Sequence, residues 1–387
     1  MSTEPDNRFD AIFVGAGVVG LGCAWRAAQR GARVCVLERD RPAAGATGVA
    51  AGMLAPVGEA SWGEEELLGF NLESLARWPG FARELEAESE LQTGFAQVGA
   101  LHVALDRDEA EELRRRYELH RSLGLDSDWL RGSECRRLEP GLATAVRGGA
   151  NVPGEASVDP RRVAAALLAA LDGRGGAVHA GAEVVGAGRD QGAWRVETAD
   201  GREFEGGNLV LTAGAWSGEA HWLPDGVPPV RPVKGEILTL RGRDDEAVCD
   251  RIVAGERVYM VPRADGRLIV GATVEERGFD TTVTAGGVHE LLREAYRLIP
   301  EIAELELVEA AAGLRPGSPD NAPLVGRGEA DGLLIATGHF RNGVLQAPVT
   351  AECIAALLAD ELPPVDLDAF SPQRFTEHRT DSAVEVA

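Results

Sequence analysis

The sequence predicts an α/β protein (α+β overall) with two domains, one of them discontinuous along the chain. Three observations lead to this fold class. Residues 10–40 read as a strand, a glycine-rich turn, a helix and a second strand. From residue 230 onward, long strands with alternating apolar residues indicate an antiparallel sheet. Residues 332–358 then return to a buried strand and a helix, so the antiparallel part interrupts the first architecture.

The first unit has the spacing of a dinucleotide-binding turn. Apolar runs at 11–14 and 34–37 flank Gly15, Gly17 and Gly20, the setting in which GxGxxG has a physical meaning. Gly15 allows the tight turn, Gly17 lets a pyrophosphate approach the backbone, and Gly20 lets the helix pack closely on the strand. The pattern predicts a Rossmann-type domain. The alternative is an ordinary tight strand–helix turn, because 48 of the 387 residues are glycine.

Two further features of this unit favour a nucleotide. The helix begins at Val18 and Val19, so its unpaired N–H groups and the positive end of its dipole would face the phosphates. Glu38 ends the second strand, where a carboxylate can accept hydrogen bonds from a ribose diol.

Composition limits the classes of partner and the compartment. A net charge of −23 disfavours nucleic acid and anionic membrane surfaces. No run of eighteen apolar residues occurs, and the acidic N-terminus does not resemble a secretory signal, so we expect a cytoplasmic protein without stable membrane insertion. The five scattered cysteines lack a CxxC pair and the seven histidines lack ligand spacing, so we expect reduced thiols and no metal.

The middle of the chain supplies the remaining elements. Small residues at 43–54 favour a loop pressed against a flat ligand, the alternative being a merely flexible loop. The pattern predicts a helix over 67–89 that breaks near Pro79, and a helix from Pro160 to Gly173 capped by Asp159. Further strands are predicted at 99–105, 177–179, 183–185, 208–217, 233–240, 257–263, 267–273, 305–314 and 332–337, and further helices at 108–123 and 344–358.

Seven segments together resemble the glycine oxidase branch of the D-amino-acid oxidase flavoprotein family. They are the Gly15–Gly20 fingerprint and residues 50–54, 232–236, 258–263, 271–273, 312–316 and 338–343, in order over nearly the whole chain. The resemblance implies non-covalent FAD and oxidation of glycine, sarcosine or a D-amino acid by hydride transfer to flavin. Molecular oxygen would then be the acceptor, giving imine, 2-oxo acid, ammonia and hydrogen peroxide. The resemblance also implies a role in thiamine thiazole formation and a homo-oligomer, a tetramer in the family.

The changes of pattern along the chain indicate how it divides. An FAD-binding domain would comprise residues 8–85, 152–222 and 318–372, and a substrate-binding domain residues 86–151 and 223–317. Residues 373–387 would be a mobile tail.

Two residues suit a substrate carboxylate on chemical grounds. An arginine fork matches both carboxylate oxygens, and Arg315 ends a strand before Pro316. Tyr259 lies on the antiparallel sheet, where its phenol can donate a second hydrogen bond. The alternatives are a surface arginine and a core tyrosine. By resemblance, Arg341 lies near both substrate and flavin. His339 is a weak candidate for a base, and packing is its favoured role, so no catalytic side-chain base is expected.

The cofactor contacts are implied mainly by the resemblance. They are Gly15, Gly17, Val18, Val19, Gly20, Glu38, Arg39, Ala46, Thr47, Ala51, Gly52, Met53, Val184, Gly214, His339, Phe340, Arg341, Asn342, Gly343, Val344 and Leu345. The helix start at 342–345 would favour the negative charge of a reduced flavin. Two positions depart from the family pattern, Ala311 and Val274, and both could change the pocket and the preferred amine.

Three rival functions remain open at this stage. A D-amino-acid dehydrogenase would pass electrons to a membrane quinone, but no basic amphipathic helix supports it. An NAD-dependent dehydrogenase is disfavoured by the small residues at 43–53 and by the returning strand and helix near the C-terminus. A flavin-binding scaffold without turnover is disfavoured by the carboxylate-binding candidates.

Overall fold

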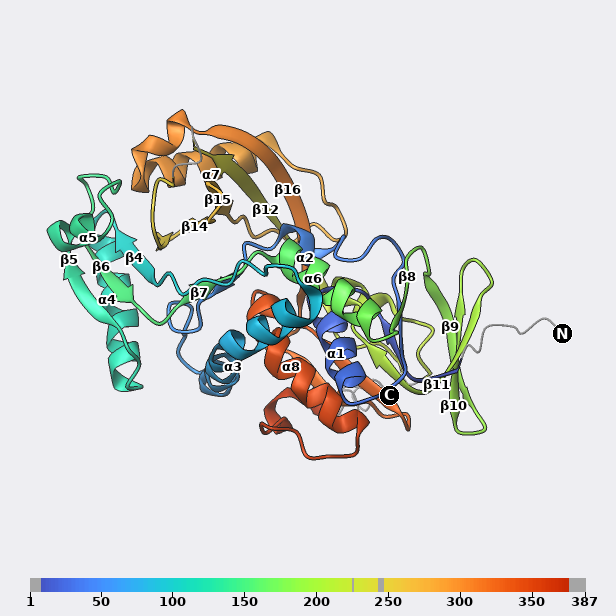
Figure 1. Ribbon diagram of the computed structural model, residues 1–387. Coiled ribbons are helices and arrows are strands. Elements are labelled where there is room, and N and C mark those ends of the chain that lie inside the picture. The colour runs from blue at the N-terminus through green and yellow to red at the C-terminus, as the bar shows by residue number, and fades with distance from the viewer. Residues whose placement is uncertain (1–7, 225, 243–246, 376–387) are drawn as a thin grey trace, which may run out of the picture.

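Two large sheets organise the computed structural model, which describes residues 8–224, 226–242 and 247–375 (Figure 1). The first runs in the order β17-β18-β11-β1-β2-β8, with β10 pairing to β11 and β9 to β10. Its central strands are parallel, from β8 through β2, β1 and β11 to β18. The bounds are β1 Arg8–Val14, β2 Val34–Leu37, β8 Ala177–His179, β9 Val184–Asp190, β10 Ala193–Thr198, β11 Glu203–Leu211, β17 Leu324–Arg327 and β18 Leu333–Thr337.

The second sheet carries the long alternating strands. Its order is β16-β12-β15-β14-β13-β4-β6-β5, and its pairs are antiparallel except for β13 with β4. The bounds are β4 Ala100–Ala104, β5 Asp128–Arg131, β6 Gly148–Val152, β12 Arg231–Arg241, β13 Ile252–Ala254, β14 Tyr259–Pro262, β15 Arg267–Gly271 and β16 Glu306–Gly317. The two sheets together confirm the predicted fold class.

Four helices gather over one face of the first sheet, and three of them contact its strands. The four are α1 (Val18–Gln29), α3 (Glu65–Ser89), α6 (Pro160–Gly173) and α8 (Gly343–Leu358) (Figure 1). Trp25 of α1 meets Phe81 of α3 edge to face at 5.1 Å, and both are buried. Asp159 caps α6 as predicted, because its carboxylate accepts from two backbone N–H groups of the first turn.

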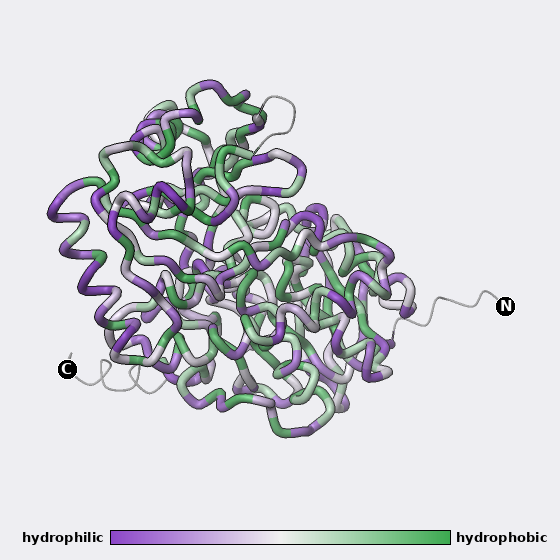
Figure 2. Tube along the Cα trace, turned by 60° about the vertical axis from the view of Figure 1, so that its left-hand side comes forward, coloured by the Kyte–Doolittle hydropathy of each residue, from purple (hydrophilic) through white to green (hydrophobic). Residues whose placement is uncertain are grey.

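The remaining elements connect or cover the two sheets. Helices α4 (Arg107–Ser122), α5 (Gly132–Leu138) and α7 (Ala285–Leu298) accompany the second sheet. Short elements are α2 (Ala46–Val49), β3 (Met53–Leu54), β7 (Ala156–Ser157) and the 3-10 helices η1 (Gly214–Glu219), η3 (Pro300–Glu304), η4 (Asp368–Phe370) and η5 (Pro372–Phe375). Much of the hydrophilic sequence lies along the outer surface (Figure 2). Among the described residues, no helix combines the length and apolar character needed to cross a membrane.

One sequence-based expectation about helices is wrong. Helix α3 continues through Pro79 without a break. A proline inside a helix costs about 3 kcal/mol, but Trp78, Phe81 and Leu85 are buried on both sides of it. Packing of this apolar face therefore outweighs the local preference to stop.

The predicted tail at 373–387 lies mostly outside the described residues. Its first three residues belong to η5, where Arg374 bonds the Asp320 carboxylate at 2.9 Å.

The contact between α1 and the turn before it gives a stability prediction. A Cβ on Gly20 would lie 2.1 Å from the Gly15 carbonyl oxygen, so Gly20→Ala should destabilise the fold by about 1–3 kcal/mol. Gly22 of the same helix is the matched control, since its Cβ would meet nothing closer than 3.8 Å. Gly22→Ala should be neutral or stabilising, by up to about 1 kcal/mol. Equal urea midpoints for the two variants would contradict this packing.

Candidate active site

A large cavity lies where the two sheets meet. Its volume is about 1590 Å³, and both sheets contribute to its wall. The first sheet contributes the loops at the carboxyl ends of its parallel strands, where open α/β sheets bind ligands. The volume exceeds the roughly 300–1,000 Å³ of a typical ligand pocket, so a dinucleotide and a small substrate can share it.

The glycine fingerprint forms one part of the wall. Gly15 has φ of +109°, and a Cβ there would lie 2.5 Å from the Thr212 carbonyl oxygen. Helix α1 begins after Gly17 without a side-chain cap and has no acidic residue in its first turn. The Val18 N–H donates to Thr47 Oγ1 at 3.0 Å. This end of the cavity offers the backbone and dipole that a pyrophosphate needs.

Glu38 directly follows β2 at the edge of the cavity. Its two carboxylate oxygens accept from the backbone N–H groups of Ala16 at 2.8 Å and Asp40 at 3.0 Å. These bonds fix the carboxylate beside the glycine turn and leave lone pairs available for a hydroxyl donor.

The small residues that follow β2 pack tightly across the cavity floor. A Cβ on Gly52, whose φ is +69°, would lie 2.1 Å from the Val158 carbonyl oxygen. A Cβ on Gly313 of β16 would lie 2.1 Å from Val49. The buried guanidinium of Arg263 donates to the Ala51 carbonyl. The segment is therefore fixed to the second sheet, which favours the ligand-contact interpretation over a flexible loop.

A second helix N-terminus reaches the cavity from the returning segment. Helix α8 begins after Asn342 without a side-chain cap, and residues 342–344 line the cavity. The turn before it is held to β16, because the Phe340 N–H donates to the Pro316 carbonyl at 2.9 Å. Phe340 has a positive φ of +46° in this turn.

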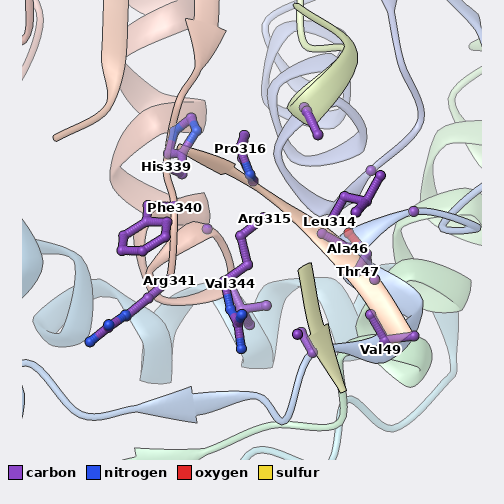
Figure 3. Close-up of a pocket in the computed structure, with 18 of the residues that line it drawn as sticks. Ala46, Thr47, Val49, Leu314, Arg315, Pro316, His339, Phe340, Arg341 and Val344 are labelled. Atoms are coloured by element: carbon purple, nitrogen blue, oxygen red, sulfur yellow. The ribbon is translucent and has the colours of Figure 1, made fainter. Parts of the chain in front are cut away.

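His339 is a buried side chain of this turn. Its Nε2 lies 3.2 Å from Thr350 Oγ1, and burial lowers the pKa of the imidazole to about 3. The neutral ring lies in the wall, away from the two guanidinium groups in Figure 3. This agrees with packing as its main role.

Arg315 and Tyr259 meet at the end of the cavity formed by the second sheet. Arg315 Nη1 donates to the backbone carbonyls of Thr273 at 3.1 Å and Lys234 at 3.3 Å. Burial lowers the pKa of the guanidinium and raises the pKa of the Tyr259 phenol, and each group stabilises the other's charge. Gly235 and Gly271 make room for these side chains, because a Cβ on either would lie within 2.6 Å of them.

Arg341 extends from the turn before α8 toward the same side as Arg315 (Figure 3). Its guanidinium lies 5.1 Å from the Phe340 ring centre. Within residues 8–224, 226–242 and 247–375, neither Arg315 nor Arg341 has an ion pair with a carboxylate. Two cations thus face a cavity without an acidic partner in contact.

The structure gathers nearly all of the predicted site residues around this cavity. Gly20 and Leu345 are the exceptions. Gly20 lies behind the turn, and the Leu345 carbonyl accepts from Ser74 and Trp78 in the helix layer. Their predicted cofactor contact is therefore at most indirect. The lining members are Gly15, Gly17, Val18, Val19, Glu38, Arg39, Ala46, Thr47, Ala51, Gly52, Met53, Val184, Gly214, Tyr259, Arg315, His339, Phe340, Arg341, Asn342, Gly343 and Val344.

Sequence reasoning missed other lining residues. Trp216 stacks on Phe279 at 5.6 Å and has the Arg39 guanidinium over its ring at 3.8 Å. Glu59 and His102 line the cavity as well. No spacing pattern singles them out, because Glu59 lies in an acidic run that reads as surface.

These features fit FAD. At glycine positions of the wall, a Cβ would fill space that glycine leaves free. Two uncapped helix N-termini also face the cavity, and they suit a pyrophosphate and an anionic flavin ring. Residues 15–19, 38–39 and 46–53 would hold its nucleotide part, and residues 339–344 its flavin.

Comparison with known proteins covers nearly the whole chain. The family model for FAD-dependent oxidoreductases (DAO) matches residues 10–357. Glycine oxidase of Geobacillus kaustophilus is 33% identical over 370 residues, which cover 95% of this chain and 97% of the relative. The crystal structure of glycine oxidase from that organism superposes with a TM-score of 0.90, covering 95% of this chain and 99% of the other.

Two further relatives broaden the comparison. The bifunctional protein ThiO/ThiG of Synechocystis is 34% identical over 371 residues, and this chain spans 54% of its length. Iminodiacetate oxidase of Chelativorans has a TM-score of 0.84 at 29% identity, covering 94% of this chain and 98% of the other.

The buried histidine gives a prediction for pH. The unfolded chain binds a proton at His339 below its ordinary pKa of 6.5, whereas the folded chain does so only near 3. Stability should therefore fall as the pH drops from 6.5 toward 3. His339→Gln should make this fall shallower, by up to about 1.4 kcal/mol per pH unit. Urea unfolding at several pH values measures it, and parallel profiles for the two proteins would refute the assignment.

Proposed function

The chain belongs to the family of FAD-dependent oxidoreductases, as its motifs predicted, and on that premise we propose that it oxidises glycine or another small amine with molecular oxygen. Sarcosine and D-amino acids are the other candidate substrates. The overall reaction with glycine consumes oxygen and water and yields glyoxylate, ammonia and hydrogen peroxide. Glycine oxidase from two sources supports this class, as a curated relative and as a solved structure.

The pairing of Arg315 with Tyr259 carries the proposal. A guanidinium whose contacts are backbone carbonyls and a phenol keeps its full charge for an incoming anion. A carboxylate fits best, because it can take the guanidinium fork and the phenol O–H together. We infer that this pair binds the substrate carboxylate and that Arg341 adds to the positive potential beside it.

The role of these residues is to position the substrate. FAD, when bound, accepts the hydride equivalent that leaves the substrate α-carbon. Arg315 and Tyr259 fix the carboxylate, and the rigid strands β14 and β16 that carry them fix the direction of the α-carbon. The uncapped start of α8 favours negative charge developing beside it. No side chain need remove a proton from carbon, which agrees with the neutral, buried state of His339.

The wider setting follows from the relatives. ThiO/ThiG supports a role for the imine product in thiamine thiazole formation.

We further propose that residues 8–85, 152–222 and 318–372 bind FAD and that residues 86–151 and 223–317 bind substrate. We also propose that the protein is cytoplasmic and forms a homo-oligomer. The alternative function is a D-amino-acid dehydrogenase that passes electrons to a quinone.

The first test uses the colour of the purified protein. It should be yellow, and glycine or sarcosine should bleach it without air, because the substrate reduces the bound flavin. Air should restore the colour with about one peroxide per amine. A colourless protein, or a yellow one that no amine bleaches, would contradict the proposal. Bleaching without peroxide would favour the dehydrogenase.

The second test removes the carboxylate partner. Arg315→Ala should lower kcat/KM for glycine by about a hundred-fold or more, because removing one member of a buried charge pair costs about 2–5 kcal/mol. Tyr259→Phe should lower it by about ten-fold, as expected for one hydrogen bond to a charged group. Arg231→Ala is the matched control, since Arg231 contacts Glu276 and the Ser318 carbonyl, outside the cavity. Unchanged steady-state kinetics in Arg315→Ala would refute the role of this arginine.

A further inference from the structure

An acidic side chain faces the substrate end of the cavity. Glu59 follows β3 and α2 in a turn that lines this wall, and its side chain is half-buried. In the part of the chain that the structure describes, its carboxylate has neither a hydrogen bond nor an ion pair. An unbonded carboxylate in a cavity wall can act on what the cavity binds.

The turn that carries Glu59 is fixed by its neighbours. The Gly58 N–H donates to Glu155 Oε1 at 2.5 Å, and the Gly58 carbonyl accepts from Arg116 at 3.4 Å. A Cβ on Gly58 would lie 2.0 Å from His102 Nε2, so only glycine fits between the turn and β4. Glu155 is wholly buried. The position of Glu59 is therefore set by the fold.

Glu59 shares the cavity with the carboxylate-binding groups. Burial raises the pKa of its carboxyl, whereas the positive charges of Arg341 and Arg315 lower it. In turn, the charge of Glu59 adds to the rise in the pKa of Tyr259 and opposes the fall in the pKa of Arg315. Glu59 and these three side chains, Arg315, Arg341 and Tyr259, therefore border the same cavity and lie close enough for their charges to interact.

We propose that Glu59 selects substrates by charge: it disfavours a second anionic group on the amine and so restricts the pocket to monocarboxylates with neutral substituents. The inference rests on the proposed amine oxidation. One carboxylate of the substrate is neutralised by Arg315. A second carboxylate would meet the partly desolvated Glu59, where like charges repel more strongly than in water.

Sarcosine and iminodiacetate form the matched substrate pair. Both are N-substituted glycines, and they differ by one carboxylate on the N-substituent. At pH 8.5, which favours the ionised carboxyl of Glu59, the wild type should prefer sarcosine. Glu59→Gln should raise the kcat/KM of iminodiacetate relative to that of sarcosine by about ten-fold. Glu59→Asp keeps the charge and should keep most of the discrimination.

A matched control separates local from overall charge. Glu66 lies in the same acidic run, is exposed and does not line the cavity, so Glu66→Gln changes net charge equally and should leave the substrate ratio unchanged. A wild-type preference for iminodiacetate would overturn the proposal. An unchanged ratio in Glu59→Gln, or equal changes in Glu59→Gln and Glu59→Asp, would overturn it too.

A binding measurement keeps this test separate from the test of function. Dissociation constants for acetate and malonate, read from the flavin absorbance of the holoprotein, need no turnover. Glu59→Gln should tighten malonate relative to acetate by a similar factor. If neither amine reduces the flavin of the wild type, the proposed function fails, and the malonate-to-acetate ratio alone decides the role of Glu59.

Discussion

Arg315 is held by two backbone carbonyls instead of carboxylates, with the Tyr259 phenol beside it, and the site depends on this constraint. The carbonyls belong to Lys234 of β12 and to Thr273 just after β15, so both segments must keep their positions. Behind them Lys234, only 1% exposed, pairs with Glu236 at 2.8 Å and lies 3.6 Å from Glu275. Thr273 Oγ1 accepts from the Glu236 N–H and donates to Glu275. Both acids thus pair with Lys234 and not with Arg315, which leaves the charge of Arg315 available to a ligand.

The substrate end of the cavity carries two guanidinium groups inside an acidic protein. The chain has a net charge of −23, yet two helix N-termini, Arg315 and Arg341 face the same space. Long-range attraction therefore contributes little to binding an anionic ligand, and screening by salt confines each charge to its neighbourhood. Discrimination between ligands therefore depends on the groups in contact with them. A single carboxylate such as Glu59 can then decide which ligand binds.

The sequence predicted features whose cause is local. The glycine turn and the Asp159 cap each follow from a few adjacent residues, and motif spacing identified the family. Features set by distant packing could not be read in this way. Helix α3 continues through Pro79 because its buried face holds it, and Glu59 reaches the cavity because Gly58 fits against His102 and Glu155. Trp216 meets Arg39 only once β11 and β2 lie in one sheet.

A crystal structure of the yellow protein with glycolate, a carboxylate without an amine, tests the central claim most directly. The account predicts FAD along the cavity, with its pyrophosphate at residues 15–19, and the glycolate carboxylate about 3 Å from the Arg315 guanidinium and the Tyr259 hydroxyl. A carboxylate bound elsewhere, with Arg315 still bonded only to the Lys234 and Thr273 carbonyls, would contradict it.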